Sequence, residues 1–142
     1  SRGLGDVYKR QAMALGRDSD LFSGGVDIHG VHDRTLYGYL NSINYEKAPD
    51  YDLARETAWK SSPIADIDTW KSPVLIIHAD DDRNVYFKQS TDLVQRLRKK
   101  KVYMETMVIV DDTHHFMMFE NQMKVNKGTA VFLIRLAEGN IN

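Results

Sequence analysis

The chain has 142 residues, of which 42% are hydrophobic and 27% are charged, and its formal net charge is −1. Length and composition are ordinary for one globular domain, and the small net charge gives no sign of a nucleic-acid-binding or membrane-surface protein. The chain has no cysteine, which excludes disulfides, thiolate zinc sites and a thiol nucleophile but does not indicate a compartment. No apolar run approaches the roughly 20 residues of a membrane span.

The first eleven residues, Ser1 to Gln11, have no clear apolar period and end in a basic cluster. Within them, Asp6 to Gln11 resembles the translation of a transposase adapter used in sequencing libraries. We interpret residues 1–11 as a non-native, adapter-derived segment and expect it to pack poorly on the rest of the chain. A native polar N-terminal arm is the alternative.

The first half of the remaining chain predicts a helix end, a strand and a second helix. Residues 12–16 are typical of a last helical turn, with Gly16 as the stop. The next strand is expected over Phe22 to His29 and is entered through two glycines. Asp52 is the expected N-cap of a helix over residues 53–59. His29, His32 and Asp33 suggest zinc ligands, but they lack a clear further ligand nearby, so structural or pocket-side histidines are favoured.

The second half alternates strand and helix. Val74 to Ile77 is a continuous, largely β-branched apolar run, which is typical of a strand buried on both faces of a parallel sheet. A helix over residues 87–101, a strand over 104–110 and a helix over about 121–137 follow, the last with Val125, Val131, Phe132 and Leu136 available for packing. This order predicts an α/β fold with a mainly parallel sheet and flanking helices.

Two of these strands end in residues suited to catalysis. Asp80, Asp81 and Asp82 follow the first strand, and Asp111 to Phe116, with its two histidines, follows the next. Open α/β sheets carry their chemistry just beyond the carboxyl ends of the strands. A carboxylate followed by a histidine in this order is typical of α/β-hydrolases, whose triad runs Ser, then Asp or Glu, then His.

Several segments resemble the catalytic domain of the prolyl oligopeptidase family of serine peptidases. They are residues 73–85 and 111–116, and also 25–33 and 61–64. The resemblance implies that residues 12–142 are the C-terminal part of a truncated α/β-hydrolase domain. It also implies a peptide substrate, no cofactor and no metal.

The same resemblance implies roles for individual residues. Asp82 matches the carboxylate that orients the catalytic histidine, and His114 matches the general base, with His115 as its rival. Asp80 and Asp81 are then turn residues. Asn84 matches a position that contacts substrate in the dipeptidyl-peptidase branch.

The nucleophile is not found, because no Gly-x-Ser-x-Gly elbow occurs in the chain. We therefore expect a fragment that lacks the upstream nucleophile region and the family's N-terminal β-propeller, and that is inactive alone. An esterase of the carboxylesterase or dienelactone-hydrolase type is the first alternative. A magnesium-binding α/β module that uses the three consecutive aspartates is the second.

Overall fold

The structure is a computed structural model and describes residues 4–36, 40 and 45–141. Three parallel strands form one sheet in the order β1-β2-β3. The strands are β1 (Gly25–Ile28), β2 (Val74–Ala79) and β3 (Met104–Ile109), and the helices are α1 (Leu4–Arg17), α2 (Tyr51–Lys60), α3 (Lys88–Lys100) and α4 (Phe119–Ala137). Short 3-10 turns lie at Arg34–Leu36, Tyr45–Lys47 and Pro63–Asp66. The prediction of an α/β fold with a parallel sheet and flanking helices is confirmed.

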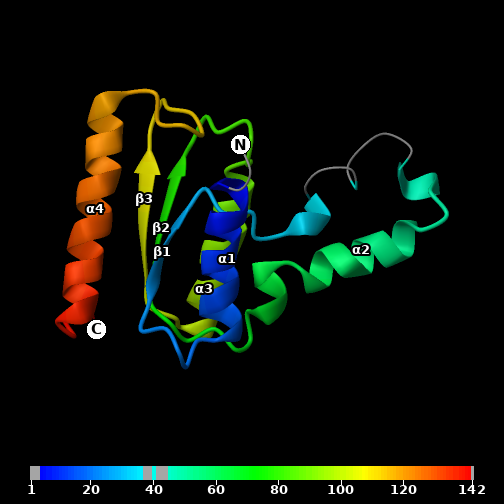
Figure 1. Cartoon of the computed structure of the whole chain (residues 1–142), viewed down its shortest axis with the longest axis horizontal. Coiled ribbons are helices and arrows are strands. Elements are labelled where there is room, and N and C mark those ends of the chain that lie inside the picture. Colours follow the sequence, from blue (N-terminus) through cyan, green and yellow to red (C-terminus); the bar gives the residue numbers. More distant parts are fainter. Residues whose placement is uncertain (1–3, 37–39, 41–44, 142) are drawn as a thin grey trace.

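The central strand β2 separates two apolar layers. All six of its residues are buried, as the continuous apolar run predicts. Val74 and Ile76 pack with residues of α1 and α3, whereas Leu75, Ile77 and Ala79 pack with Val125 and Phe132 of α4 and with Ile109 of β3. Figure 1 shows the result, with α4 on one side of the sheet and α1 and α3 on the other. The alternation of side chains along one strand therefore produces a three-layer arrangement.

The two later helices follow the predicted spacing. Leu93 and Leu97 of α3 are fully buried, and Lys101 ends that helix in the left-handed conformation. In α4, Phe132 is only 1% exposed and Leu136 packs against the core, but Val131 is 46% exposed. The prediction for Val131 is wrong, since adjacent helical positions differ by about 100° in direction and cannot both face the sheet.

Helix α1 runs one residue past its expected stop. Gly16 lies inside the helix, where an added Cβ would come within 3.2 Å of the Trp70 ring. Its role here is close packing. Of the segment interpreted as adapter-derived, residues 4–11 form the N-terminal part of α1, and residues 1–3 lie outside the described part of the chain. Residues 1–11 have no clear apolar period, so the sequence did not predict this part of the helix. The origin of the segment stays a prediction.

Two other boundaries differ from expectation. Helix α2 begins at Tyr51 with Asp50 as N-cap, so Asp52 lies in the first turn and the predicted cap is wrong by two positions. An acidic side chain suits either place, because both lie at the positive end of the helix dipole. Strand β1 stops before His29, whose φ of 51° turns the chain out of the sheet. In Figure 1, α2 extends away from the sheet, so the site described below depends on the other elements.

Within the described residues, no helix is both long and apolar enough to cross a membrane.

Candidate active site

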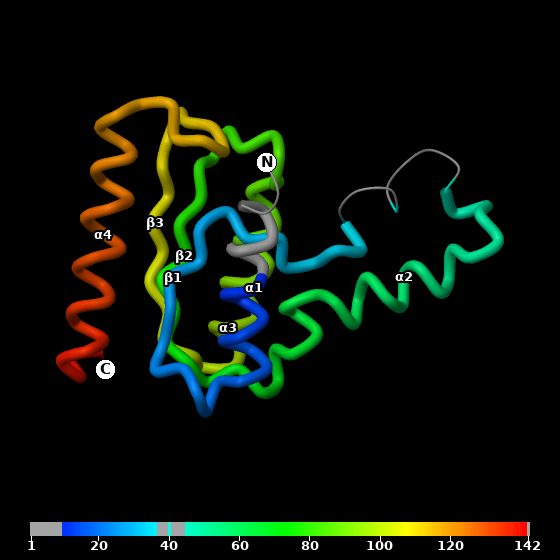
Figure 2. Tube along the Cα trace, viewed as in Figure 1, coloured from blue at the N-terminus to red at the C-terminus, as the bar shows by residue number. Residues whose placement is uncertain are grey.

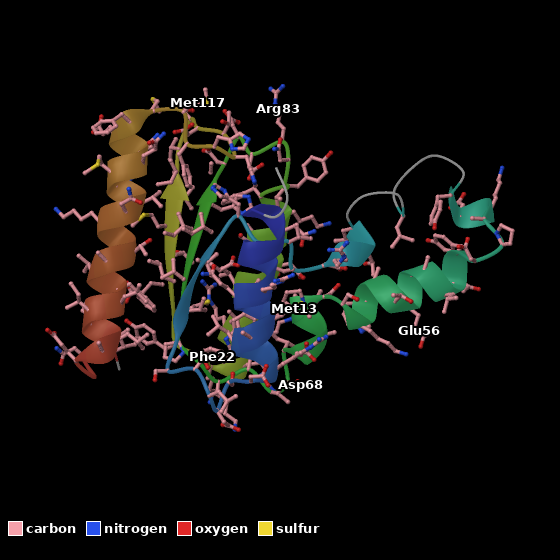
Figure 3. All side chains as sticks on the ribbon, in the orientation of Figure 1. Met13, Phe22, Glu56, Asp68, Arg83 and Met117 are labelled. Carbon is pink, nitrogen blue, oxygen red and sulfur yellow. The ribbon has the colours of Figure 1, made fainter. Side chains whose placement is uncertain are left out.

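The loops that follow β2 and β3 meet at one end of the sheet. The tube in Figure 2 shows them side by side, and Figure 3 places Arg83 and Met117, one from each loop, at the same end of the molecule. The two strands are paired in parallel, with Ala79 opposite Ile109, so their carboxyl ends coincide. The backbone N–H of Asp111 also donates to the Asp80 carboxylate, 2.9 Å away, which ties one loop to the other.

The carboxylate of Asp82 is buried and held by its own loop. Its residue is 4% exposed, and its Oδ1 accepts hydrogen bonds from the backbone N–H groups of Asn84 (2.8 Å) and Val85 (2.9 Å). Burial alone would raise the pKa of Asp82, but these N–H groups and His114 outweigh it and hold the pKa below its usual value. Asp82 is therefore an anion at neutral pH, and Oδ2 is directed to other partners.

His114 is the closest of those partners. Its Nδ1 lies 2.7 Å from Asp82 Oδ2. Since an ionised carboxylate can only accept, Nδ1 carries the proton of this hydrogen bond, and in the neutral ring the free lone pair is on Nε2. The imidazole is partly exposed, at 18% of its side chain. The hydrogen bond predicted between these two residues is present, and it fixes the tautomer that a general base needs.

The loop that carries His114 is built around Asp112. The Asp112 carboxylate accepts hydrogen bonds from the backbone N–H of Thr113 and Met117 and from the Asn121 side chain, each at 2.8 Å. Burial raises the pKa of this carboxyl, but the hydrogen bonds more than compensate and lower it. Asp111 and Phe116, at either end of the loop, both have positive φ. The loop therefore makes a tight turn that presents His114 to Asp82.

Comparison with known proteins identifies the family. A sequence profile described as "Prolyl oligopeptidase family" matches residues 11–139. The chain belongs to the prolyl oligopeptidase family. Members of this family are serine peptidases. The Asp82–His114 pair lies beyond the carboxyl ends of two parallel strands, where open α/β sheets carry their chemistry.

Solved structures of two peptidases share this fold. A dipeptidyl peptidase 4 from Porphyromonas gingivalis superposes with a TM-score of 0.76 at 17% identity, covering 89% of this chain and 18% of its own. An acylaminoacyl peptidase from Pyrococcus horikoshii gives a TM-score of 0.62 at 25% identity, covering 75% of this chain and 18% of its own. The chain thus spans less than a fifth of the length of either relative and forms part of an α/β-hydrolase fold. No curated protein matches the chain.

The other residues singled out in the sequence of this family member lie nearby but differ in setting. His115 is exposed, and its ring meets that of His114 edge to face at 5.3 Å between centroids. The Asn84 side chain is exposed, while its backbone N–H serves Asp82. Asp80 accepts from the neighbouring loop and Asp81 is exposed, so the contacts of these carboxylates differ from those of Asp82. The catalytic and substrate-binding roles of Asp82, His114 and Asn84 stay predictions.

The two histidines of the 29–33 segment lie in different surroundings. His32 donates from Nε2 to Asp27 (2.8 Å) and from Nδ1 to the Gln89 carbonyl (3.0 Å), so it is a buried, fully hydrogen-bonded structural histidine. Burial lowers its pKa, but attraction to Asp27 and both hydrogen bonds more than reverse this and raise it. Asp33 is occupied by Thr35, whose backbone N–H donates to its carboxylate. His29 instead lies beside Asp82.

Two histidines that sequence reasoning did not assign to the site therefore surround the Asp82 carboxylate. His29 Nδ1 and His78 Nε2 each lie 3.3 Å from Asp82 Oδ2. Both side chains are at most 3% exposed. The four-residue spacing from His78 to Asp82 was visible in the sequence. In a strand followed by a turn, however, this spacing does not predict that the two side chains are in contact. His29 lies just beyond the neighbouring strand β1, and the sequence singled it out only as a zinc-ligand candidate or pocket-side histidine, with no sign that it contacts Asp82.

His78 is also hydrogen-bonded to a serine. Its Nε2 lies 2.9 Å from the Val85 carbonyl, so Nε2 carries the proton, and its Nδ1 accepts from the Ser90 hydroxyl at 2.6 Å. Ser90, His78 and Asp82 thus lie next to one another in that order, with the Ser90 hydroxyl on Nδ1 of His78 and the Asp82 carboxylate 3.3 Å from Nε2. Ser90 is only 4% exposed and lies on α3, so its hydroxyl has a structural role. Burial is the main reason that the pKa of His78 is lowered.

Proposed function

We propose that this chain is the C-terminal part of a serine-peptidase catalytic domain in which His114 is the general base and Asp82 orients it. The observation that carries the proposal is the 2.7 Å hydrogen bond from His114 Nδ1 to a buried carboxylate. The two residues follow adjacent parallel strands in a member of a peptidase family. A satisfied surface pair would not need an anion buried to this degree.

The geometry suits proton transfer from a serine hydroxyl. In the neutral His114 ring, Nε2 carries the lone pair and the ring is partly exposed, so Nε2 can take the proton of a hydroxyl that approaches from outside. The imidazolium that forms has its Nδ1–H directed at the Asp82 anion, which stabilises the charge without itself taking the proton. Base and orienting group are thus assigned within the chain.

The nucleophile is proposed to come from other residues of a longer polypeptide. No Gly-x-Ser-x-Gly elbow occurs in the 142 residues. Ser90 is buried and is hydrogen-bonded to His78 instead of His114. The chain spans less than a fifth of the length of its solved relatives. In this proposal residues 12–142 belong to the catalytic domain and residues 1–11 are not native; the family match, which begins at residue 11, supports that division.

The proposed substrate is a peptide. The two relatives are named a dipeptidyl peptidase and an acylaminoacyl peptidase, so both are named for action on peptides. The exposed Asn84 side chain, two residues beyond Asp82, is the proposed substrate contact on this chain. An esterase would use the same Asp–His pair, because activation of the serine is common to both reactions.

The test uses the longer polypeptide that contains residues 12–142. We expect it to cleave dipeptidyl- or acylaminoacyl-nitroanilides. The Asp82→Asn change should lower kcat about 10⁴-fold, as loss of the orienting carboxylate does in a serine-protease triad. His114→Ala should lower kcat by a factor on the order of 10⁶. The exposed neighbour provides the control, since His115→Ala should retain turnover.

Three outcomes would contradict the assignment. Activity retained by His114→Ala but lost by His115→Ala would make His115 the base. Turnover of esters without turnover of nitroanilides would favour the esterase. Absence of a Gly-x-Ser-x-Gly motif in frame before Ala12 would remove the proposed nucleophile.

A further inference from the structure

The strongest feature that the proposed function leaves unused is the pair of buried histidines beside Asp82. We propose that His29, His78 and Asp82 form a zinc-binding site, and that zinc bound there withdraws the Asp82 carboxylate from His114. One ligand atom from each of the three residues lies within 4.8 Å of the other two, and all three residues are buried. This site is independent of the peptidase proposal, because it requires only the folded chain.

The distances fit a tetrahedral ion. Zinc binds imidazole nitrogen and carboxylate oxygen at about 2.0–2.2 Å, which puts neighbouring ligand atoms of a tetrahedron about 3.3–3.5 Å apart. The two measured edges, His29 Nδ1 to Asp82 Oδ2 and His78 Nε2 to Asp82 Oδ2, are both 3.3 Å. The third edge, between the ligand nitrogens of His29 and His78, is at most 4.8 Å and would shorten when both bind one ion. Two nitrogens and one oxygen favour zinc over magnesium, which takes oxygen ligands.

The state of His29 gives a second, independent indication. Neither of its ring nitrogens has a hydrogen-bond partner in the described part of the chain, although the residue is only 4% exposed. An unpartnered buried imidazole costs free energy that a bound ion would recover.

The surroundings supply the supporting contacts that such a site needs. The Ser90 hydroxyl can accept a hydrogen bond from His78 Nδ1 instead of donating one, so His78 can change tautomer. Its Nε2 then gives up the hydrogen bond to the Val85 carbonyl and is free for the metal. Asp82 keeps its two backbone N–H bonds on Oδ1 and offers Oδ2. Entry is past His114, whose ring is partly exposed, because the rings of His29 and His78 are both buried.

Occupation of the site has a defined consequence. The atom that zinc would bind, Asp82 Oδ2, is the atom that accepts the hydrogen bond from His114 Nδ1. Bound zinc and the His114–Asp82 hydrogen bond therefore compete for one oxygen. In a peptidase that uses this pair, zinc would act as an inhibitor at the orienting carboxylate.

The experiment is a calorimetric titration of the EDTA-treated 142-residue chain with zinc chloride. We expect one zinc per chain. The His29→Asn and His78→Gln variants should each bind at least about tenfold more weakly, since even an outer-shell partner is worth 10–100-fold in affinity. His29→Asn is chosen because asparagine tolerates the left-handed conformation seen at this position. The His115→Asn variant is the matched control, because it removes an exposed histidine outside the ligand set, and its affinity should be unchanged.

Nitrogen-15 NMR of the histidine rings keeps the proposal testable if a buried variant does not fold. In the unchanged chain, one equivalent of zinc should shift the ring nitrogens of His29 and His78 and remove the downfield Nδ1 proton signal of His114. No saturable binding, affinity that both variants retain, or zinc-induced shifts limited to His114 and His115 would each overturn the proposal. Magnesium at the same concentration should produce none of these changes.

Discussion

At the residue scale, the Asp82 carboxylate determines which nitrogen of His114 carries the hydrogen-bonded proton. His114 donates to it from Nδ1, and His29 and His78 lie just beyond hydrogen-bonding geometry or have another partner. Three imidazoles near one anion could all be charged, yet burial keeps the pKa of His29 and of His78 low. Asp82 therefore accepts its hydrogen bond from His114 Nδ1, and this bond defines the tautomer of the neutral His114 ring.

The first prediction concerns this tautomer. Replacement of Asp82 by Asn should leave the loop in place, because the amide oxygen can still accept from Asn84 and Val85. The amide N–H₂ then faces His114 Nδ1, which must become an acceptor, so the proton should move to Nε2. Ring nitrogen-15 shifts report the tautomer directly. Asp81→Asn is the control, since Asp81 is exposed; a His114 spectrum unchanged by Asp82→Asn would show that the hydrogen bond does not form in solution.

The second prediction concerns acid stability. The pKa of His29 is about 4 in the folded chain and 6.5 as its ordinary value, so the unfolded chain binds the extra proton between these limits. Stability from this residue is therefore present above about pH 6.5 and is lost as the pH falls toward 4. Between about pH 8 and pH 5 the loss should be about 2 kcal/mol in the free energy of unfolding.

Urea unfolding of the unchanged chain and of His29→Asn at both pH values isolates this contribution. The variant should lose less stability on acidification, by about the same 2 kcal/mol. His32 works in the opposite direction, because its pKa is raised, but its effect is common to both chains and cancels in the difference. Equal pH dependence in the two chains would mean that His29 is not buried in solution.

At the element scale, α4 covers one face of the sheet through few side chains. Val125 and Phe132 are its buried residues, and the helix is otherwise largely exposed. A helix held by so few contacts depends strongly on each of them, because helical propensity alone does not stabilise it.

The third prediction follows from adjacent residues of α4. Phe132→Ala should lower the free energy of unfolding by about 3–5 kcal/mol, because it removes a ring that is 1% exposed and leaves a cavity against β2 and β3. Val131→Ala should change it by less than about 0.5 kcal/mol, since Val131 is 46% exposed and alanine favours the helix. Chemical denaturation measures both, and a larger loss for Val131→Ala would place the wrong face of α4 on the sheet.

At the scale of the whole molecule, Asp82 and His114 are the two residues proposed for the triad, and no serine is hydrogen-bonded to His114 in the described part of the chain. Asp82 and His114 are in place, and Ser90, the serine bonded to His78, is buried. Removing the nucleophile of a triad costs about as much as removing the triad, on the order of 10⁶ in turnover.

The fourth prediction is therefore that the 142-residue chain alone is inert. Assayed with aminoacyl- and dipeptidyl-nitroanilides it should show no turnover that His114→Ala abolishes. A fluorophosphonate probe should not label it stoichiometrically. Labelling would point to Ser90 as an active nucleophile, and loss of that labelling in Ser90→Ala, with Ser72→Ala as the buried-serine control, would establish it.

The sequence by itself determined the main strands and helices. It also indicated Asp82 and His114, the two residues that follow the carboxyl ends of neighbouring strands. Strands and helices follow from local apolar periodicity, so the run from Val74, the face of α3 and the order of Asp82 and His114 could be read without a structure. Element boundaries were less secure, as Gly16 and Asp52 show, because capping and close packing depend on neighbours that the local pattern does not contain.

Only the tertiary structure decided what surrounds Asp82. His29 reaches it from just beyond β1, His78 from within β2 and His114 from beyond β3, and these three positions are related by strand order and register. The bond from Ser90 to His78 depends in the same way on how α3 packs against β2. Spacing along a chain cannot specify contacts between strands, since register is fixed when whole faces are buried together. That is why the sequence pointed to one histidine beside this carboxylate and the fold placed three there.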